Sequence, residues 1–195
     1  MLIRLRAETA AAHQRLEESL GLVDRLASTE DYRRLIEGFW GLYAGIEPRL
    51  APLIRDQQWP LQWELRRKLP LIEKDLRVLG ASSPEIAGLP VCEEFPSLAS
   101  QARVLGVLYV LEGSTLGGQH ISKLVETRLR LGPANGAAFF NGYGRETGSM
   151  WKKFCAVITE WAPGGFMGDE MVFAAVETFE TFRNWLCHEP QQVHD

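Results

Sequence analysis

The sequence predicts an all-α fold, a compact bundle of several helices in a single domain. Apolar residues recur every three to four positions along most of the chain, which is the spacing of one face of an α-helix. No segment shows the strict alternation of apolar and polar residues that is typical of a half-buried strand. Residues 82–96 and 132–144 are loop-like stretches that separate the helical ones. We therefore expect helices packed on one another around one core.

Residues 2–20 are predicted to form the first helix. A second helix begins after Ser28, whose hydroxyl can cap a helix start, and Pro48 and Pro52 lie near its end. Residues 62–79 indicate a third helix, which Pro70 interrupts.

The second half of the chain is expected to be equally helical. A long helix is predicted over 97–131, and two closing helices over 145–161 and 169–186. The closing helices are expected to join across residues 163–165, a Pro-Gly-Gly sequence. The tail from Glu189 should be frayed.

Composition limits the classes of protein to consider. The 195 residues suit one domain over 1–195, and 46% hydrophobic and 24% charged residues are ordinary for a globular protein. A net charge of −4, with no basic stripe, gives no reason to expect nucleic acid as a partner. Cys92, Cys155 and Cys187 are odd in number and far apart, which suits a reducing compartment. With no apolar run long enough for a membrane span and no signal peptide at the N-terminus, we expect a cytoplasmic protein.

Three glycines, Gly113, Gly117 and Gly118, lie inside the predicted helix 97–131. A glycine in a helix interior costs about 1 kcal/mol relative to alanine, so three of them need a reason. Bare backbone allows the close approach of either a large flat ligand or another helix. At 100° per residue, one face of this helix carries Gly106, Tyr109, Val110, Gly113, Gly117, His120 and Leu124. Gly118 lies off this face, which suits bending or close helix packing.

His13 is the candidate metal ligand of the first helix. It is expected on the apolar stripe formed by Leu2, Leu5, Thr9, Ala12, Leu16 and Leu20. Glu17, one turn later, can accept a hydrogen bond from one ring nitrogen while the other nitrogen binds a metal. A histidine on an apolar stripe can also be a plain core histidine, so the residue alone leaves both interpretations open.

Other chemistries lack their motifs. The chain has no glycine-rich dinucleotide or phosphate loop and no His-Glu-x-x-His motif. None of His13, His120 and His188 has a glutamate three residues earlier, as a di-iron bundle would need. What remains is a helical pocket with one axial histidine and a smooth glycine surface, which suits a planar cofactor held between two helices.

Taken together, two segments resemble the heme oxygenase family. Residues 5–13 with Glu17 are similar to the proximal helix of that family, and residues 113–118 are similar to its distal helix. The separation of the two segments and the length of the chain also fit. The resemblance covers nearly the whole chain and is closest to the bacterial, biliverdin-producing branch that includes phytochrome-associated heme oxygenases. It implies that heme is both cofactor and substrate and is cleaved, with dioxygen and external electrons, to biliverdin, carbon monoxide and ferrous iron.

The resemblance also implies roles for residues. His13 would bind the heme iron, with Glu17 as its hydrogen-bonding support. Gly113 and Gly117 would form a distal roof where backbone approaches the dioxygen site, and Gly118 would complete the motif.

Ser114 departs from the pattern, because many members of the family carry an aspartate that anchors distal water at this position. A serine hydroxyl can still position a water, although it carries no negative charge at neutral pH. Ser114 is therefore a candidate catalytic residue, and the departure leaves the group that anchors the distal water open. His120, in phase with the glycines, is a candidate wall residue of the distal side, or a histidine simply hydrogen-bonded near the helix end.

Heme propionates need cations or hydroxyls at the mouth of a pocket. The resemblance points to Arg6 and Lys152 for this task, and Tyr143 is a neighbour that could serve instead. Each could equally be a solvated surface residue. The tyrosine of the distal helix is displaced by one position, because Leu108 occupies its place and Tyr109 follows.

The implied partners are heme, dioxygen and an external electron donor such as a ferredoxin, a flavodoxin or a reductase. A phytochrome that accepts the bilin product is a further possible partner. Two alternatives remain at this point, a heme carrier or gas sensor on the same fold, and a helical scaffold that binds no heme.

Overall fold

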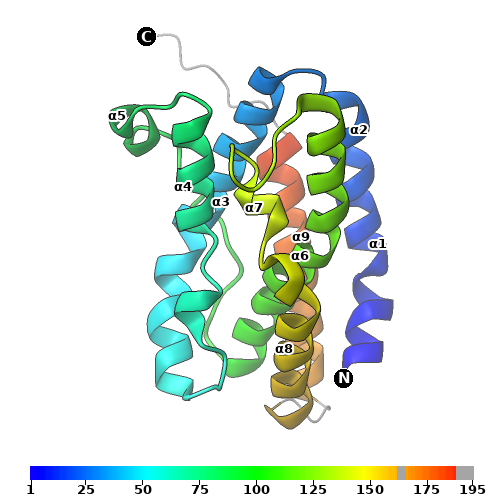
Figure 1. Cartoon of the computed structure of the whole chain (residues 1–195). Helices are drawn as coiled ribbons and strands as arrows, with labels where there is room; N and C mark the ends of the chain where they lie inside the picture. The colour runs from blue at the N-terminus through cyan, green and yellow to red at the C-terminus, as the bar shows by residue number, and fades with distance from the viewer. Residues whose placement is uncertain (162–165, 188–195) are drawn as a thin grey trace, which may run out of the picture.

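In a computed structural model, which describes residues 1–161 and 166–187, the chain is a helical bundle, and the described residues include no β-strand (Figure 1). The long helices are α1 (Leu2–Leu20), α3 (Thr29–Gln57), α6 (Gln101–Leu129), α8 (Thr147–Trp161) and α9 (Phe166–Cys187). The shorter elements are α2 (Leu22–Arg25), η1 (Trp63–Leu65), α4 (Leu69–Val78), α5 (Ser83–Ala87), α7 (Ala138–Asn141) and η2 (Gly144–Glu146). The all-α prediction is confirmed.

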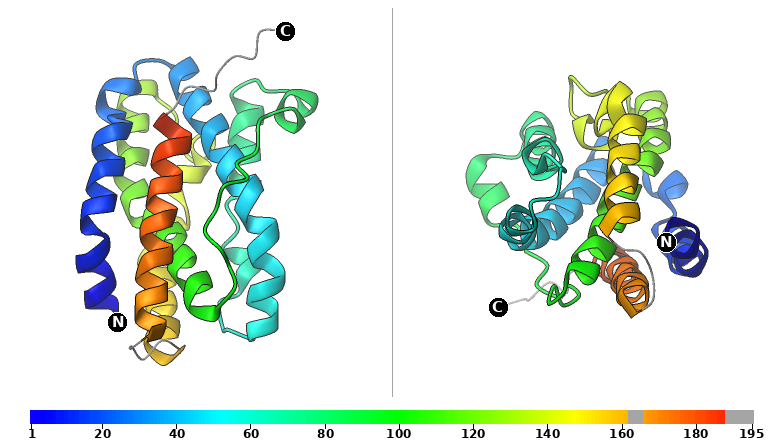
Figure 2. Two further views of the ribbon diagram at one scale, coloured as in Figure 1. Left: turned by 180° about the vertical axis from the view of Figure 1, so that it is seen from behind. Right: turned by 90° about the horizontal axis from the view of Figure 1, so that it is seen from below.

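Three of the long helices, α1, α3 and α6, contact helix α9. Both α1 and α6 pack mainly against it, and α3 contacts α4, α6 and α9 (Figure 2). Charge pairs join α9 to its neighbours: Arg4 to Asp169 at 2.5 Å, Arg15 to Glu180 at 2.6 Å and Arg103 to Glu177 at 2.6 Å. Since α1 and α6 share α9 as their main support, they stand on either side of a common space.

The second helix begins as predicted, and the two prolines expected near its end lie within its last turns. The Ser28 hydroxyl accepts a hydrogen bond from the backbone N–H of Asp31, which caps the start of α3. Pro48 and Pro52 lie inside this helix, which continues to Gln57. Burial of its apolar face, which includes Leu50 and Ile54, favours continuation of the helix past the two missing N–H donors.

The third predicted helix is shorter than residues 62–79. Pro70 lies in the first turn of α4, where proline is tolerated because the N–H there needs no intrahelical partner. It therefore starts a helix and does not interrupt one. The predicted loop 82–96 contains α5, which is capped by reciprocal bonds between Ser82 and Glu85. The predicted join at 163–165 and the tail from Glu189 lie outside the described residues.

Residues 88–99 form a non-helical segment along α3, and its close approach requires glycine at two positions of that helix. The backbone N–H of Cys92 donates to the carbonyl of Gly41 at 3.1 Å. A side chain at Gly41 would meet the carbonyl oxygen of Pro90 at 2.5 Å, and one at Gly45 would collide with the carbonyl of Cys92. These glycines allow the segment to lie directly on the helix.

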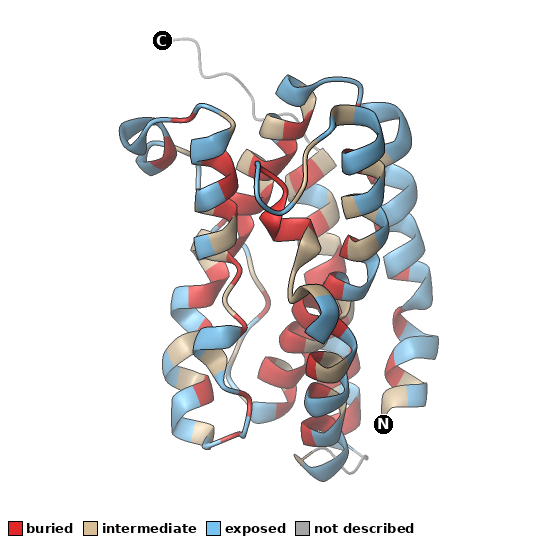
Figure 3. Ribbon diagram, in the orientation of Figure 1, coloured by how far each residue is buried: buried red, intermediate tan, exposed pale blue. Residues whose placement is uncertain are grey.

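Buried residues are concentrated where α3, α6 and α9 meet, while the outer face of α1 is exposed (Figure 3). The core is one contiguous cluster, as the single-domain prediction requires. Cys92, Cys155 and Cys187 are free thiols, and burial raises the pKa of each. Within the described part of the chain, no helix is both long and apolar enough to span a membrane.

Candidate functional site

A cavity of about 860 Å³ lies between α1 and α6. This volume falls in the range of about 300–1,000 Å³ that is usual for small-molecule sites. Its walls are mostly apolar and include Phe39 of α3, Phe139 and Phe140 of α7, and Phe179 and Phe182 of α9. The cavity thus has two helical walls and an aromatic interior.

On the α1 wall, His13 and Glu17 both line the cavity. The buried residues of α1 are Leu5, Thr9, Ala12, Leu16 and Leu20. His13 lies beside this stripe, with its side chain 53% exposed, so its predicted place on the buried stripe is corrected. Its Nε2 lies 3.5 Å from the Glu17 carboxylate, and its ring tilts against Phe179 at 5.3 Å between centroids. His13 is a histidine of the cavity wall that a ligand would cover.

The glycines of α6 fall into two groups. A Cβ at Gly117 would meet nothing within 4 Å, and one at Gly113 would only touch Trp151 at 3.9 Å. A Cβ at Gly118 would lie 2.9 Å from the carbonyl oxygen of Phe140, and one at Gly106 would collide with the carbonyl of Met171. Helix packing therefore accounts for Gly106 and Gly118. It does not account for Gly113 and Gly117, which border open cavity.

Three further predicted residues line the same cavity, namely Ser114, Tyr109 and His120. The Ser114 hydroxyl donates to the carbonyl of Leu111 at 2.8 Å and also bonds with the hydroxyl of Tyr43. The half-buried Tyr109 packs against Trp151 and forms a hydrogen bond with Thr9, which connects the two walls. Burial raises the pKa of Tyr109, so its phenol stays neutral.

The residues proposed for the propionates are not all at the cavity. Arg6 is exposed and lines it, whereas neither Lys152 nor Tyr143 is among the lining residues. The Tyr143 hydroxyl donates to the carboxylate of Glu112 at 2.9 Å. The expectation for Tyr143 is therefore corrected, because its hydroxyl is bound inside the protein and not presented at the mouth of the cavity.

Glu112 is the centre of a buried polar cluster that the sequence did not reveal. One oxygen of its carboxylate accepts a hydrogen bond from the Tyr143 hydroxyl, and the other accepts one from the guanidinium of Arg66. Arg66 also donates to the backbone carbonyls of Leu61 at 2.5 Å and Met150 at 3.2 Å. Glu112 is 2% exposed and Arg66 3%, so the pair is fully desolvated. One sequence signal existed, since Glu112 directly precedes Gly113 in an otherwise apolar stretch.

Lys68 continues this cluster to the cavity wall. It is 3% exposed, its Nζ donates to the carbonyl of Arg66 at 2.8 Å, and its Nζ lies 3.6 Å from the centre of the Tyr143 ring. Burial lowers the pKa of Lys68 to about 8, although Glu112 and Glu47 act in the opposite direction. Burial also raises the pKa of Glu47, whose carboxylate accepts the backbone N–H groups of residues 68 and 69.

The aromatic end of the cavity is held by a single carboxylate. Asp75 of α4 is fully buried and accepts the backbone N–H groups of Ala138 at 2.8 Å and Phe139 at 2.7 Å. These two N–H groups lie at the start of α7, which carries Phe139 and Phe140. Burial raises the pKa of Asp75, and the two backbone bonds oppose this shift.

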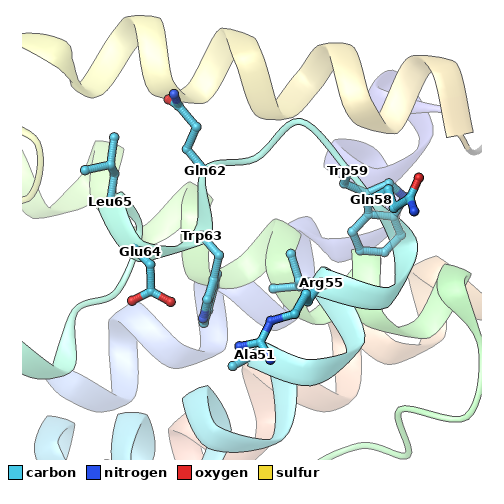
Figure 4. A pocket seen from close by; sticks show the side chains of 9 residues that line it. Ala51, Arg55, Gln58, Trp59, Gln62, Trp63, Glu64 and Leu65 are labelled. Carbon is cyan, nitrogen blue, oxygen red and sulfur yellow. The ribbon is translucent and has the colours of Figure 1, made fainter.

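A second hollow, of about 440 Å³, lies between the end of α3 and η1 (Figure 4). Its polar side chains are those of Arg55, Gln58, Gln62 and Glu64, and Trp59 and Trp63 also line it. It contains none of the residues that the sequence singled out.

The donor set of the main cavity suits a metal that brings most of its own ligands. Among residues 1–161 and 166–187, no cluster of three or more His, Cys, Asp or Glu side chains could hold a bare metal ion. One wall offers the imidazole of His13, and the other offers backbone at Gly113 and Gly117 with free space before it. A flat macrocycle whose iron takes one protein ligand fits this combination.

Comparison with known proteins agrees with this geometry. The heme oxygenase family model matches residues 1–188. A heme oxygenase of Xanthomonas campestris pv. campestris (strain 8004) is 29% identical over 165 residues, which cover 82% of this chain and 91% of that protein.

Two solved structures share the fold. The heme oxygenase of Neisseria meningitidis, solved with bound NO and CO, superposes with a TM-score of 0.79 at 20% identity, over 94% of this chain and 88% of that chain. The heme oxygenase of Leptospira interrogans superposes with a TM-score of 0.73 at 16% identity, over 94% of this chain and 96% of that chain. With a family model that matches almost its entire length, the chain belongs to the heme oxygenase family.

Proposed function

We propose that this chain, which as a heme oxygenase degrades heme to biliverdin, binds the heme in the cavity between α1 and α6 with His13 as the iron ligand. The observation that carries the proposal is the open space at Gly113 and Gly117, which no protein atom fills, across the cavity from His13. Family membership does not favour the two alternatives, a heme carrier and a scaffold without heme.

The bound heme would supply the redox-active iron and would itself be the molecule that is oxidised. His13 would coordinate through a neutral imidazole, and Glu17 would orient the ring by accepting from its other nitrogen. In the structure Nε2 is the nitrogen near Glu17, so coordination through Nε2 would need a rotation of the ring that brings the other nitrogen to the Glu17 carboxylate. The phenylalanines of α3, α7 and α9 would exclude water from the ring faces.

The distal wall would act mainly through its shape. Backbone at Gly113 and Gly117 would allow dioxygen to lie between the heme and the helix without a side chain in the way. The Ser114 hydroxyl donates a hydrogen bond to the Leu111 carbonyl and also bonds with the Tyr43 hydroxyl, so its oxygen would keep one lone pair to accept from a water in the cavity. Arg6, which is exposed on the cavity wall, would pair with a heme propionate. Lys152 is not among the residues that line the cavity, so it would pair only with a propionate that extends beyond the cavity.

The reaction needs electrons from a partner. We propose a ferredoxin, a flavodoxin or a reductase that docks near the exposed heme edge, at the mouth of the cavity by Arg6. A phytochrome is a candidate acceptor of the biliverdin product, and the cytoplasm is the proposed compartment.

The first test is titration of the purified protein with hemin, followed by absorption spectroscopy, and then reduction in air with ascorbate or a ferredoxin system. Wild type should give a saturable one-to-one Soret band that collapses as a biliverdin band grows. His13→Ala should alter the Soret band and stop turnover. Gln14→Ala is the matched control, because Gln14 is the next residue of α1 and its exposed side chain donates to Glu18.

An unchanged Soret band in His13→Ala would show that another group binds the iron. A stable Soret band in reduced, aerated wild type would contradict turnover by this chain.

A further inference from the structure

Lys68 is a cation of the cavity wall to which the proposed function has given no task. It lies in the segment between η1 and α4 and lines the cavity, as Tyr43 also does, and its Nζ lies over the ring of Tyr143. Five lysines occur in the chain, and Lys68 is the one that lies buried. Removal of an ammonium group from water is costly, so its place here calls for an explanation.

The carboxylates around Lys68 are occupied by other donors. Glu112 binds Arg66 and Tyr143, and Glu47 binds the backbone N–H groups of residues 68 and 69 together with Arg67. Within the described chain, no carboxylate oxygen lies within salt-bridge distance of the Lys68 Nζ. The ammonium can therefore lose its proton without breaking an ion pair.

The Lys68 ammonium group also has donor capacity left over. It has three N–H donors; one bonds the Arg66 carbonyl, and the Tyr143 ring accepts the cation from above. One N–H donor remains, on a residue that is among those lining the cavity. Lys68 thus holds a proton at an atom that is fixed by the protein, in the wall of the space where the heme would lie.

We propose that Lys68 delivers protons to the distal side of the heme pocket, a task for which Ser114 provides no acid. The proposal rests on the proposed function. In each transfer, one Nζ–H bond breaks and the proton passes, directly or through a water, to an oxygen acceptor in the cavity, and the amine that remains takes a proton from solvent. No electron moves through Lys68.

The groups around Lys68 suit this exchange. Burial brings its pKa to about 8, close enough to neutral pH that the ammonium and the amine interconvert readily. Glu112 of α6 and Glu47 of α3 favour the ammonium, while Arg66 favours the amine. Tyr43 and Tyr143 have strongly raised pKa values because they are buried, so they remain neutral and do not compete as proton donors.

The first test does not depend on turnover. Lysine labelled with ¹³C at Cε gives five resonances, and Lys68→Met identifies the one that belongs to Lys68. In the heme-free protein this resonance should titrate at about 8. A titration near the ordinary lysine pKa of about 10.4 would overturn the proposal.

The second test separates proton delivery from a structural role. Lys68→Gln keeps a neutral donor for the Arg66 carbonyl but has no proton to transfer, and Lys74→Gln is the control at an exposed lysine of α4. Lys68→Gln should bind hemin with an unchanged Soret band. Its rate of biliverdin formation should fall to roughly a hundredth of the wild-type rate or lower. The pH dependence that wild type shows between about pH 7 and 9 should be lost. Lys74→Gln should match wild type.

Two results of the activity assays would refute the proposal. Full activity and a wild-type pH profile in Lys68→Gln would show that the side chain only supports the Arg66 carbonyl. If Lys68→Gln fails to fold, the resonance of Lys68 in wild type decides the question alone. Wild type that binds hemin but does not degrade it would refute the proposed function, and the Lys68 proposal with it, before any variant is made.

Discussion

Replacement of Gly117 by alanine should stabilise the heme-free protein and weaken its binding of heme. Gly117 lies well inside α6, and a Cβ there would meet no atom within 4 Å. Alanine therefore gains helix propensity without a steric cost. The same methyl group would project into the space that we assign to the heme and its dioxygen.

The size of each effect follows from the geometry. The gain from glycine to alanine in a helix interior is about 1 kcal/mol, which for a domain of this size raises Tm by roughly 2–4 °C. At Gly118 the same gain is opposed by a contact of 2.9 Å with the backbone carbonyl of Phe140. Overpacking of this kind costs about 1–3 kcal/mol, so Gly118→Ala should be neutral or less stable than wild type.

Thermal unfolding followed by circular dichroism, with and without hemin, measures both effects. Hemin at about 100 times its Kd should stabilise wild type by about 2.7 kcal/mol, and a tenfold loss of affinity in Gly117→Ala should reduce this gain to about 1.4 kcal/mol at the same hemin concentration. A heme-free Gly117→Ala protein that melts below wild type would refute the assignment of Gly117 to open space. An undiminished hemin effect would refute the assignment of this wall to the ligand.

Three further predictions concern the buried polar groups. Glu112→Leu leaves the buried Arg66 guanidinium without its carboxylate and should lower the free energy of unfolding by about 3–5 kcal/mol, or Tm by roughly 6–20 °C. The double variant Glu112→Leu with Arg66→Met should recover part of this loss in the same thermal melt. No recovery would contradict the pairing of the two residues. Asp75→Ala removes the acceptor of two buried N–H groups at α7 and should lower the free energy of unfolding by about 2–4 kcal/mol in urea titrations, together with hemin affinity. Lys68 binds fewer protons folded than unfolded above its lowered pKa of about 8, so stability should rise with pH. Relative to Lys68→Met, wild type should gain about 2 kcal/mol between about pH 7 and 9.5, and a flat difference would show that Lys68 titrates normally.

The long helices could be predicted from the sequence because their causes are local. Ser28 caps α3 by a bond to a residue three positions away, and the apolar spacing of α1 and α6 is visible in the chain itself. Pro48 and Pro52 indicated that the end of α3 is near but not the residue at which it ends, because tertiary burial of the residues that follow them outweighs the two missing donors and the helix continues to Gln57.

The candidate site was predictable only in part. Gly113 and Gly117 could be singled out because glycine in a helix interior is unusual, and the helical phase separated them from Gly118. The same phase wrongly grouped Gly106 with the cavity face, because the path of α9 over α6 is not visible in the sequence.

The partners of the buried charges were out of reach of sequence reasoning, although the place of Glu112 in an apolar stretch was visible. Arg66 and Glu112 are 46 residues apart, and nothing local distinguishes Arg66 from its exposed neighbour Arg67. A lone basic residue is usually solvated, so Lys68 gave no signal either. Tyr143 was noticed for its hydroxyl, but its partner depended on where η2 lies relative to α6.

The attachment of α1 has a mechanical consequence. This wall is held to α9 by apolar packing and by two charge pairs, Arg4 with Asp169 and Arg15 with Glu180, near its two ends. Exposed pairs of this kind weaken as salt screens them. If α1 moves away while α6 stays on α9, the cavity between α1 and α6 becomes wider. The rate at which a bulky molecule leaves the cavity should therefore rise with ionic strength.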